Sequence, residues 1–182
     1  SVTTVLSILT EDFIRAWRNR VGEEQADIVS GKASRRGTKV HSIVEKYLNN
    51  EDTSDFLPHI QQSLKNLKPV LDNGIGTIFG LEVALYSHYL GVAGRCDCVA
   101  EYNGKLSVID FKTANKERQE SWIENYFLQT TAYAIMYEEI FGKPIEQIVI
   151  LLAGEDGSVA CYKKNRKDYE ESLGKAIQDF YK

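Results

Sequence analysis

The dipeptide Asn103-Gly104 constrains the fold of this chain more than any other short feature of its sequence. It joins two runs rich in apolar and β-branched residues, 90–102 and 105–111. Asn-Gly is a preferred pair for the two-residue turn of an antiparallel hairpin, because both turn positions need a positive φ. Counting outward from this turn, Asp97 on the first strand faces Asp110 on the second, so two carboxylates should lie on one face of a sheet.

Hydrophobic periodicity predicts the remaining elements. We expect helices over about 10–22, 34–48, 53–67, 118–141 and 166–181, the third closed by Lys68-Pro69, and strands over 77–86, 145–153 and 158–164. Helices, then a three-strand antiparallel meander, then helix, strand, strand and helix indicate an α/β fold around a central mixed β-sheet flanked by helices. The chain should therefore form a single domain, 1–182, with an N-terminal helical region, 1–70, and a sheet-and-helix core, 77–182.

Composition fits one globular domain. Of the 182 residues, 43% are hydrophobic and 26% are charged, which is close to the average of soluble domains. No apolar run approaches the roughly 20 residues of a membrane-spanning helix, and the first residues carry no visible secretory signal. The three cysteines form neither an even disulfide framework nor a zinc pattern, which favours a reducing compartment. We therefore expect an intracellular protein with no membrane partner.

Positive charge is concentrated near the N-terminus. Residues 15–46 hold eight Lys or Arg against four Asp or Glu, although the whole chain has a net charge of -4. The overall charge argues against nonspecific adhesion to nucleic acid, but it is compatible with a local basic surface. A solvated helix face would produce the same pattern, so both interpretations stay open.

Asp110 and Lys112 lie two residues apart on a predicted strand and therefore project from the same face. Buried charges are costly unless they are paired, bound to metal or used in chemistry. An ion pair at a strand end would explain these two residues alone. Asp97 on the facing strand favours a metal site over a simple ion pair, because two adjacent carboxylates repel each other unless a proton or a cation intervenes. Oxygen ligands suit Mg²⁺ or Mn²⁺, and an added imidazole favours Mn²⁺.

Three further positions could belong to such a site, and each has a simpler explanation. Glu82, on the preceding strand, is a third acidic contributor or a solvated residue of an edge strand. His41, on the second helix, is a ligand or an ordinary surface or core histidine. Gln129 and Tyr133 are four residues apart on the long helix and share a face with Tyr126, which is also typical of a packed face with a polar rim.

Taken in order, these residues resemble the RecB-like exonuclease branch of the PD-(D/E)XK nuclease superfamily. The pattern of that branch is GxxxH on a helix, an acidic residue on a strand, GxxD, DxK and QxxxY. This chain has Gly37-Thr38-Lys39-Val40-His41, Glu82, Gly94-Arg95-Cys96-Asp97, Asp110-Phe111-Lys112 and Gln129-Thr130-Thr131-Ala132-Tyr133. Each motif alone is weak, but five in order over residues 37–133 form a strong signal.

The resemblance implies a restriction-endonuclease-like core and a role for each motif residue. A metal site for Mg²⁺ or Mn²⁺ would consist of His41, Asp97, Asp110 and the backbone carbonyl of Phe111. Lys112 would position or activate the attacking water, Glu82 would assist as an outer ligand, and Gln129 would orient Lys112 or the phosphate. Tyr133 would contact the nucleic-acid backbone. Branch members with an iron–sulfur cluster use four cysteines, so no such cluster is expected here.

The basic N-terminal segment and several aromatic residues would then contact nucleic acid. Candidates for phosphate contacts are Arg15, Arg18, Arg35, Arg36 and Lys39. Trp17, Trp122 and Tyr126 could stack on unpaired bases, although core packing is the simpler explanation for any one aromatic. RecB-like exonucleases thread a single strand beneath a helical arch, and the helices before residue 70 would supply that arch.

The leading hypothesis is a metal-dependent DNA exonuclease that prefers single-stranded ends and acts in repair, recombination or replication. An endonuclease of the same superfamily, restriction-type or structure-specific, is the first alternative. The second is a noncatalytic nucleic-acid-binding module with a degenerate nuclease fold. Because the sequence holds no phosphate-binding GxxxxGK[ST] loop, any motor, like other replication or recombination proteins, would be a separate partner. A phage or viral protein in a host cytoplasm is expected, with a mitochondrial form as the alternative.

Overall fold

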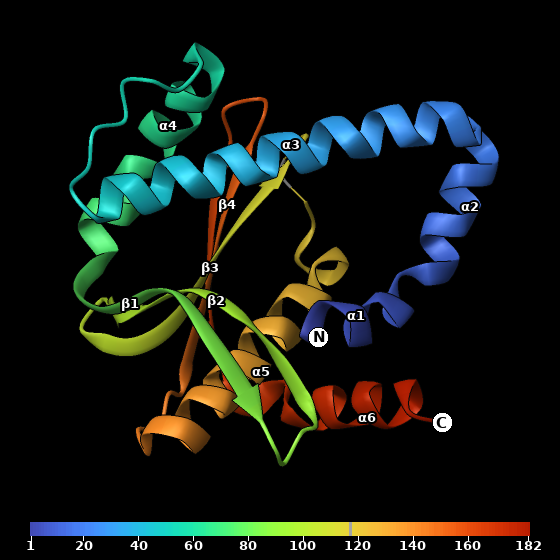
Figure 1. Ribbon diagram of the computed structural model, residues 1–182, viewed down its shortest axis with the longest axis vertical. Coiled ribbons are helices and arrows are strands. Elements are labelled where there is room, and N and C mark those ends of the chain that lie inside the picture. The colour runs from blue at the N-terminus through green and yellow to red at the C-terminus, as the bar shows by residue number, and fades with distance from the viewer. Residues whose placement is uncertain (117) are drawn as a thin grey trace.

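A central five-stranded sheet organises the computed structural model, which describes residues 1–116 and 118–182 (Figure 1). Its strands are β1 (Ile75–Ser87), β2 (Val92–Tyr102), β3 (Lys105–Ala114), β4 (Gln147–Gly154) and β5 (Val159–Asn165), in the order β1-β2-β3-β4-β5. The first three strands pair antiparallel, β3 and β4 pair parallel, and β4 and β5 pair antiparallel. The expected meander and the mixed sheet of an α/β fold are therefore confirmed.

The hairpin between β2 and β3 has the predicted register. Its Asn103-Gly104 turn has φ angles of 50° and 80°, and a two-residue type I′ turn requires positive values at both positions. The ladder runs from the turn to the pair formed by Cys98 and Ile109. The next positions on the two strands are Asp97 and Asp110, so the turn alone brings the two carboxylates to the same level of the sheet.

Helices cover both faces of the sheet (Figure 1). One face carries α1 (Val2–Leu6), α5 (Glu124–Phe141) and α6 (Glu170–Phe180), and the other carries α4 (Pro58–Gly74) and the second half of α3 (Glu23–Leu48). Phe127 and Met136 are fully buried on the first face, and Ile43 and Leu67 are fully buried on the second. Removal of these large apolar side chains from water is the main stabilising contribution to such a layered domain.

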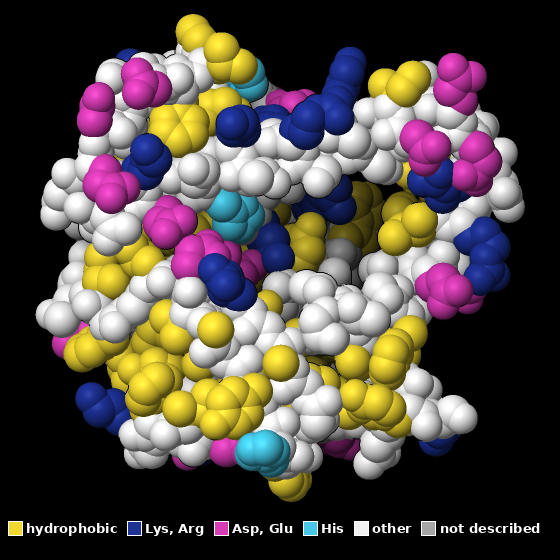
Figure 2. Space-filling view, in the orientation of Figure 1, with side chains coloured by type: hydrophobic (Ala, Val, Ile, Leu, Met, Phe, Trp, Pro, Cys, Tyr) yellow, Lys and Arg dark blue, Asp and Glu magenta, His cyan; other side chains and the backbone are white. Residues whose placement is uncertain are grey.

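An N-terminal arm, formed by α2 (Glu11–Val21) and the first half of α3, projects from this core. The two helices meet at Gly22, whose φ of 89° suits a glycine. No residue of α2 is buried, and Figure 2 shows the surface hollowed beneath α3, between α2 and the core. The arm therefore stands over an opening, which we call the hollow, and it does not pack on the sheet.

Helix α3 is longer than the sequence predicted, because it begins at Glu23 and not near Ser34. Between these two residues only Ala26 is buried. Residues 23–33 therefore lack the apolar stripe from which an amphipathic helix is recognised. The predicted stripe of the second half is confirmed, since Val40 and Ile43 are fully buried.

Helix α4 begins at Pro58, and it continues through Pro69 to Gly74. The predicted span of 53–67, closed by Lys68-Pro69, is therefore wrong at both ends. A proline inside a helix removes one backbone hydrogen bond and usually ends the helix. Here Leu67 and Leu71, on either side of Pro69, are each 1% exposed, so packing against the sheet holds the helix together across the missing bond.

The two C-terminal helices begin later than predicted. A short 3₁₀ turn, Glu120–Trp122, precedes α5, and another, Arg166–Asp168, precedes α6. Such turns are frequent at helix ends. No helix in the described part of the chain is long and apolar enough to cross a membrane.

The hairpin of β1 and β2 changes face halfway along its length. Residues i and i+2 of a strand normally point to one side, yet Leu81 packs in the α3–α4 cluster while Val83 packs in the α5 cluster. Glu82, between them, has a φ of 50°, far from the extended region. The same change of face occurs on β2 between Cys98 and Cys96. The regular alternation of side chains along β1 is therefore interrupted at Glu82, and both strands exchange their inward and outward faces at this level.

Candidate active site

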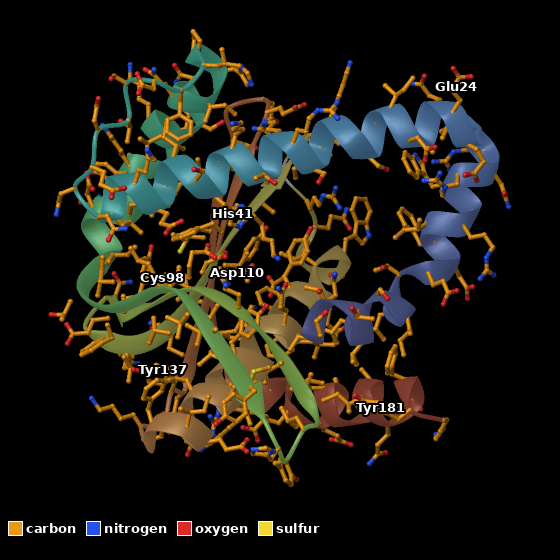
Figure 3. All side chains as sticks on the ribbon, in the orientation of Figure 1. Glu24, His41, Cys98, Asp110, Tyr137 and Tyr181 are labelled. Carbon is orange, nitrogen blue, oxygen red and sulfur yellow. The ribbon has the colours of Figure 1, made fainter. Side chains whose placement is uncertain are left out.

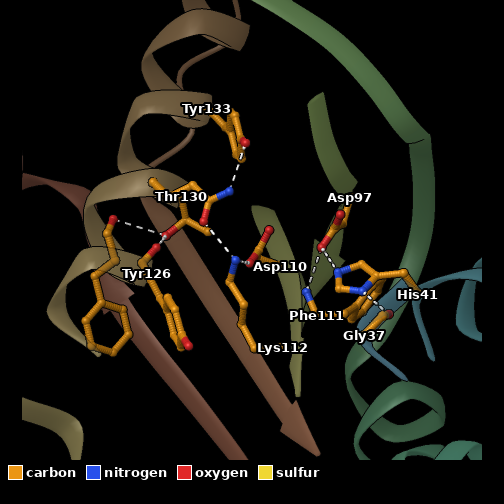
Figure 4. Close-up of polar contacts among 11 residues, drawn as sticks. Gly37, His41, Asp97, Asp110, Phe111, Lys112, Tyr126, Thr130 and Tyr133 are labelled. Carbon is orange, nitrogen blue, oxygen red and sulfur yellow. Dashed lines mark hydrogen bonds and ion pairs between the residues drawn. The ribbon is translucent and has the colours of Figure 1, made fainter. Parts of the chain in front are cut away.

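Asp97 lies where the paired register of β2 and β3 ends. Beyond the pair of Cys98 and Ile109, the Oδ2 atom of Asp97 accepts the backbone N–H of Phe111 at 2.8 Å. The same oxygen lies 3.1 Å from Nε2 of His41 on α3 (Figure 4). One carboxylate therefore takes the place of a ladder acceptor and joins β2, β3 and α3.

His41 is held at its other ring nitrogen, Nδ1, which lies 2.8 Å from the Gly37 carbonyl oxygen. A Cβ atom at Gly37 would lie 3.4 Å from Oγ1 of Thr113, so α3 and the end of β3 are in close contact at this point. Figure 3 shows His41 extending from α3 toward Asp110 on the sheet. The GxxxH motif therefore brings its histidine to the level of the acidic residues.

His41 and Asp97 form a charged pair. Burial alone would lower the pKa of His41, but the hydrogen bond and the charge of Asp97 outweigh burial and raise it to about 9. Burial alone would raise the pKa of Asp97, but the contact with His41 outweighs it and lowers that pKa. Near neutral pH the imidazole is therefore protonated and the carboxylate is ionised.

Asp110 and Lys112 form a second pair, on the α5 face of the sheet. Nζ of Lys112 lies 2.9 Å from Oδ2 of Asp110, and Asp110 is 2% exposed. That oxygen has no well-aligned hydrogen bond, so the contact is an ion pair of poor directionality. Burial, which the nearby charge of Asp97 reinforces and Lys112 partly offsets, raises the pKa of Asp110 to about 7.

Side chains of helix α5 contact the ammonium group of Lys112. Nζ of Lys112 donates to Oε1 of Gln129 at 2.8 Å, and Nε2 of Gln129 donates to the hydroxyl oxygen of Tyr133 at 2.9 Å (Figure 4). The ring of Tyr126 lies 4.8 Å from the same ammonium. The i and i+4 spacing of the QxxxY motif therefore allows two consecutive hydrogen bonds, from Lys112 to Gln129 and from Gln129 to Tyr133, which we call the relay.

Tyr133 does not reach a surface from which it could contact nucleic acid. It is 2% exposed, and a Cβ atom at Gly94 would lie 2.8 Å from its Cε1 atom. The glycine of the GxxD motif therefore leaves the space that the tyrosine ring fills. This placement corrects the expected contact between Tyr133 and a phosphate backbone, because the buried hydroxyl oxygen instead accepts a hydrogen bond from Gln129.

Glu82 lies opposite Asp97 in the register of β1 and β2, between the paired positions 81 and 83. Burial, followed by the charges of Asp97 and Glu45, raises its pKa. Glu45 is the acidic residue that the sequence reasoning missed. It is four residues after His41 on α3, and this helical spacing could have identified it.

The donors at this site suit a divalent cation. Two carboxylates and a backbone carbonyl are ordinary ligands of Mg²⁺ or Mn²⁺, and an added imidazole favours Mn²⁺. Oδ2 of Asp110 is buried without an aligned hydrogen bond, which leaves lone pairs free for a cation. Within residues 1–116 and 118–182, however, no three His, Cys, Asp or Glu side chains already stand in a metal-binding arrangement. Asp97 is paired with His41, and Asp110 with Lys112.

The candidate phosphate-binding residues fall into two groups. The two candidate arginines of α2 are already paired with acids: Arg15 with Glu11 and Asp12, and Arg18 with Glu23 and Asp27. Arg36 donates to the Ala114 carbonyl oxygen at 3.2 Å and joins α3 to the end of β3. Arg35 and Lys39 are exposed on α3. Of the five predicted residues, these last two offer the most accessible positive charge.

The candidate stacking aromatics also differ in their surroundings. Trp122, on the turn before α5, is 65% exposed. Trp17 is half-buried on α2, and the ring of Tyr126 faces Lys112. Phe13, also on α2, is 74% exposed. Among these aromatics, Phe13 on the arm and Trp122 before α5 therefore offer the most accessible rings.

One class of nucleases combines a mixed sheet of this kind with two acidic residues and a lysine on adjoining strands. Residues 60–179 match the PD-(D/E)XK nuclease superfamily, over more than half of the chain. The chain therefore belongs to the PD-(D/E)XK nuclease superfamily.

Individual relatives can be named as well. The chain is similar to Mitochondrial genome maintenance exonuclease 1 from Homo sapiens, with 29% identity over 183 residues, and to the same protein from Mus musculus, with 30% identity over 159 residues. The matches cover 88% and 81% of this chain but 50% and 46% of the relatives. The chain therefore spans about half the length of the curated relatives it matches.

The fold also resembles a solved structure from Eubacterium rectale that is provisionally named an exonuclease. The two structures superpose with a TM-score of 0.52 at 8% sequence identity, over 80% of this chain and 66% of the other. At this identity the likeness concerns the fold alone.

Proposed function

We propose that this chain is a metal-dependent exonuclease that hydrolyses single-stranded DNA from its ends. The observation that carries the proposal is the relay together with the ion pair of Lys112 and Asp110, placed beside Asp97 on adjoining strands. Membership of the nuclease superfamily supports the hydrolysis of phosphodiester bonds. The similarity to proteins named as exonucleases supports an action at ends.

A divalent cation would be held by Asp97, Asp110, the Phe111 carbonyl and His41, whose imidazole would release its proton when the metal binds. When bound, Mg²⁺ or Mn²⁺ would lower the pKa of a coordinated water and offset charge on the scissile phosphate. The Asp110 carboxyl group, whose pKa is raised to about 7 by burial, is suited to exchange its proton or its lysine partner for such a cation.

Lys112 would stabilise the negative charge that develops on the phosphate. Burial alone would lower its pKa, but the charge of Asp110 outweighs burial and raises it, so the side chain enters the reaction as an ammonium. Gln129 fixes the direction of that ammonium, and pre-organised positive charge of this kind is a major source of rate enhancement. Glu82, half-buried beside Asp97, would hold the attacking water by accepting one of its hydrogen bonds.

The arm would select strand ends. The hollow beneath α3 is bounded by α2, α3 and the core (Figure 2), and a free end can enter an enclosed opening more readily than a closed circle. Accessible aromatic groups, including Trp122 and Phe13, would stack on unpaired bases of the entering strand. An intracellular role in DNA repair, recombination or replication, in a phage-infected host or in a mitochondrion as for the named relatives, is part of this proposal.

The test uses end-labelled linear single strands, linear duplexes and closed single-stranded circles, incubated with Mg²⁺ or Mn²⁺. Loss of linear single strands, intact circles and inactive Asp110→Asn and Lys112→Met variants is the expected result. Cleavage of the circles would indicate an endonuclease. Binding without cleavage under either metal would indicate a noncatalytic nucleic-acid-binding module.

A further inference from the structure

A second basic surface lies along α3, apart from the candidate active site. It is a groove of about 750 Å³ between α3 and the start of α4, which we call the outer groove. Its main lining side chains are Lys32, Arg35, Lys39, Lys46, Phe56 and His59. Figure 2 shows Lys and Arg side chains along the edge of α3 that faces away from the hollow.

Helix geometry separates the outer groove from the catalytic residues. At about 100° per residue, Lys32, Arg35, Lys39 and Lys46 lie roughly 120–180° around the axis of α3 from His41. His41 contacts Asp97 on the sheet side of the helix. A phosphate bound in the groove is therefore a different phosphate from the one at the site of cleavage.

The positive charge of the groove is only partly neutralised by the protein. Among the residues that the structure describes, no carboxylate lies within ion-pair distance of Lys32, Arg35 or Lys39. The acids that line the groove are Asp55 and Glu155, and Glu155 lies 3.6 Å from Arg36. Like charges one turn apart on a helix repel each other. We call the row formed by Lys32, Arg35, Lys39 and Lys46 the stripe. An anionic ligand would therefore stabilise the stripe more than the surrounding protein does.

The length of the stripe suits a chain of phosphates. At 1.5 Å of rise per residue, Lys32 and Lys46 are about 21 Å apart along the axis, which corresponds to about six phosphates of a B-form strand. The groove also contains apolar surface, since Phe56 lines it beside Leu57, which is 64% exposed. Rows of basic side chains beside apolar or aromatic surface are typical of sites that bind single strands.

We propose that the outer groove binds the phosphate backbone of a nucleic-acid segment several nucleotides away from the scissile bond. This inference rests on the proposed nuclease function, because that function supplies the polyanion. The groove extends the footprint of the enzyme past α3, so affinity rises with strand length beyond what the hollow alone can hold.

The test compares two variants that lose the same positive charge. The groove variant carries Lys32→Gln, Arg35→Gln, Lys39→Gln and Lys46→Gln. The control variant carries Lys105→Gln, Lys143→Gln, Lys163→Gln and Lys167→Gln, four exposed lysines outside the groove. Fluorescence anisotropy in EDTA measures the binding of single strands of about 8 and about 30 nucleotides, lengths chosen to fill one short site or to extend beyond it.

We expect the groove variant to bind the long strand at least about 10-fold more weakly than wild type, and the slope of log K against log salt to fall by about 2 to 3. The control variant should lose less than about 3-fold, since its lysines make no phosphate contact. A circular dichroism melt of each variant verifies that the fold is retained.

Three results would overturn the inference. Equal losses in the groove and control variants would mean that net charge alone is responsible. Equal losses on the short and long strands would place these residues at the site of cleavage. Wild-type affinity in the groove variant would point to an acidic protein as the occupant. Binding in EDTA is independent of catalysis. A wild-type protein that cleaves nothing with either Mg²⁺ or Mn²⁺ would therefore refute the proposed function, and the anisotropy result would still decide whether the outer groove binds nucleic acid.

Discussion

Nζ of Lys112 on β3 donates to Oε1 of Gln129 on α5 at 2.8 Å, and this bond fixes the ammonium beside Asp110. The bond links two motifs that are 17 residues apart in sequence. It is a charge-assisted hydrogen bond, a kind that is stronger and more directional than a bond between neutral groups. The orientation of Lys112 therefore depends on a residue that itself carries no charge.

Replacing Gln129 with leucine should reduce kcat on single-stranded DNA by about 10- to 100-fold, because losing a hydrogen bond to a charged group costs about 1.5 to 3 kcal/mol. Tyr133→Phe removes only the acceptor behind Gln129 and should cost a few-fold. Steady-state kinetics on a short labelled strand measure both effects. A Gln129→Leu enzyme with wild-type kcat would show that the bond does not orient Lys112.

Gly94→Ala should damage both stability and activity, because the new methyl group would lie 2.8 Å from Cε1 of Tyr133. Overpacking of this kind costs about 1 to 3 kcal/mol, and a displaced Tyr133 would carry Gln129 with it. Gly174→Ala, in helix α6 with no atom within 4 Å of the new methyl group, is the matched control and should be neutral or stabilising. Urea unfolding and kcat are the measurements; a fully active Gly94→Ala variant would contradict the assigned role of the glycine.

The stability of the metal-free protein should fall as pH rises from about 4 to about 7. Burial raises the pKa of Asp110 from 3.8 to about 7 in the folded state, so the folded protein keeps a proton that the unfolded chain releases. The resulting stabilisation is complete below the unfolded pKa and is lost as pH rises through the folded pKa. Asp110→Asn should flatten this part of the curve, measured by denaturant unfolding in EDTA.

The control for that prediction is Asp52→Asn. Hydrogen bonds from Ser54 lower the pKa of Asp52, so its contribution is present above the unfolded pKa and is lost only as pH falls. This variant should leave the slope between pH 5 and pH 7 as in wild type. Equal slopes in wild type and Asp110→Asn would mean that Asp110 does not titrate in this range.

Mg²⁺ or Mn²⁺ should raise the melting temperature of the wild-type protein at pH 8. A ligand at a hundred times its Kd stabilises by about 2.7 kcal/mol, which corresponds to about 5–10 °C for a chain of this size. Asp97→Asn and Asp110→Asn should each remove most of the shift, while Asp179→Asn, on helix α6, should keep it. A full shift in the Asp110→Asn protein would place the cation elsewhere.

Much of the site could be predicted because its rules are local. The Asn103-Gly104 turn determined the register that brings Asp97 level with Asp110, since a two-residue turn leaves one pairing. Strand alternation put Asp110 and Lys112 on one face, and helical spacing put Gln129 and Tyr133 one turn apart. Each of these relationships depends only on regular backbone geometry within one helix, one strand or one hairpin.

Other features were decided by packing between distant segments. His41 reaches Asp97 across 56 residues of sequence, and no local rule specifies where α3 lies on the sheet. Tyr133 is buried because Gly94 leaves space for its ring. The positive φ of Glu82 accompanies a change of face that alternation alone would exclude.

The sequence by itself therefore determined the order of the elements, the hairpin register and the kind of chemistry that the motif residues can perform. Only the tertiary structure decided the length of α3 and the continuation of α4 through Pro69. It also decided which basic residues are paired with acids, such as Arg15 and Arg18, and which line the outer groove. The physical reason is that backbone propensities and turns act between neighbours in sequence, while burial and charge pairing depend on which distant side chains share the same space.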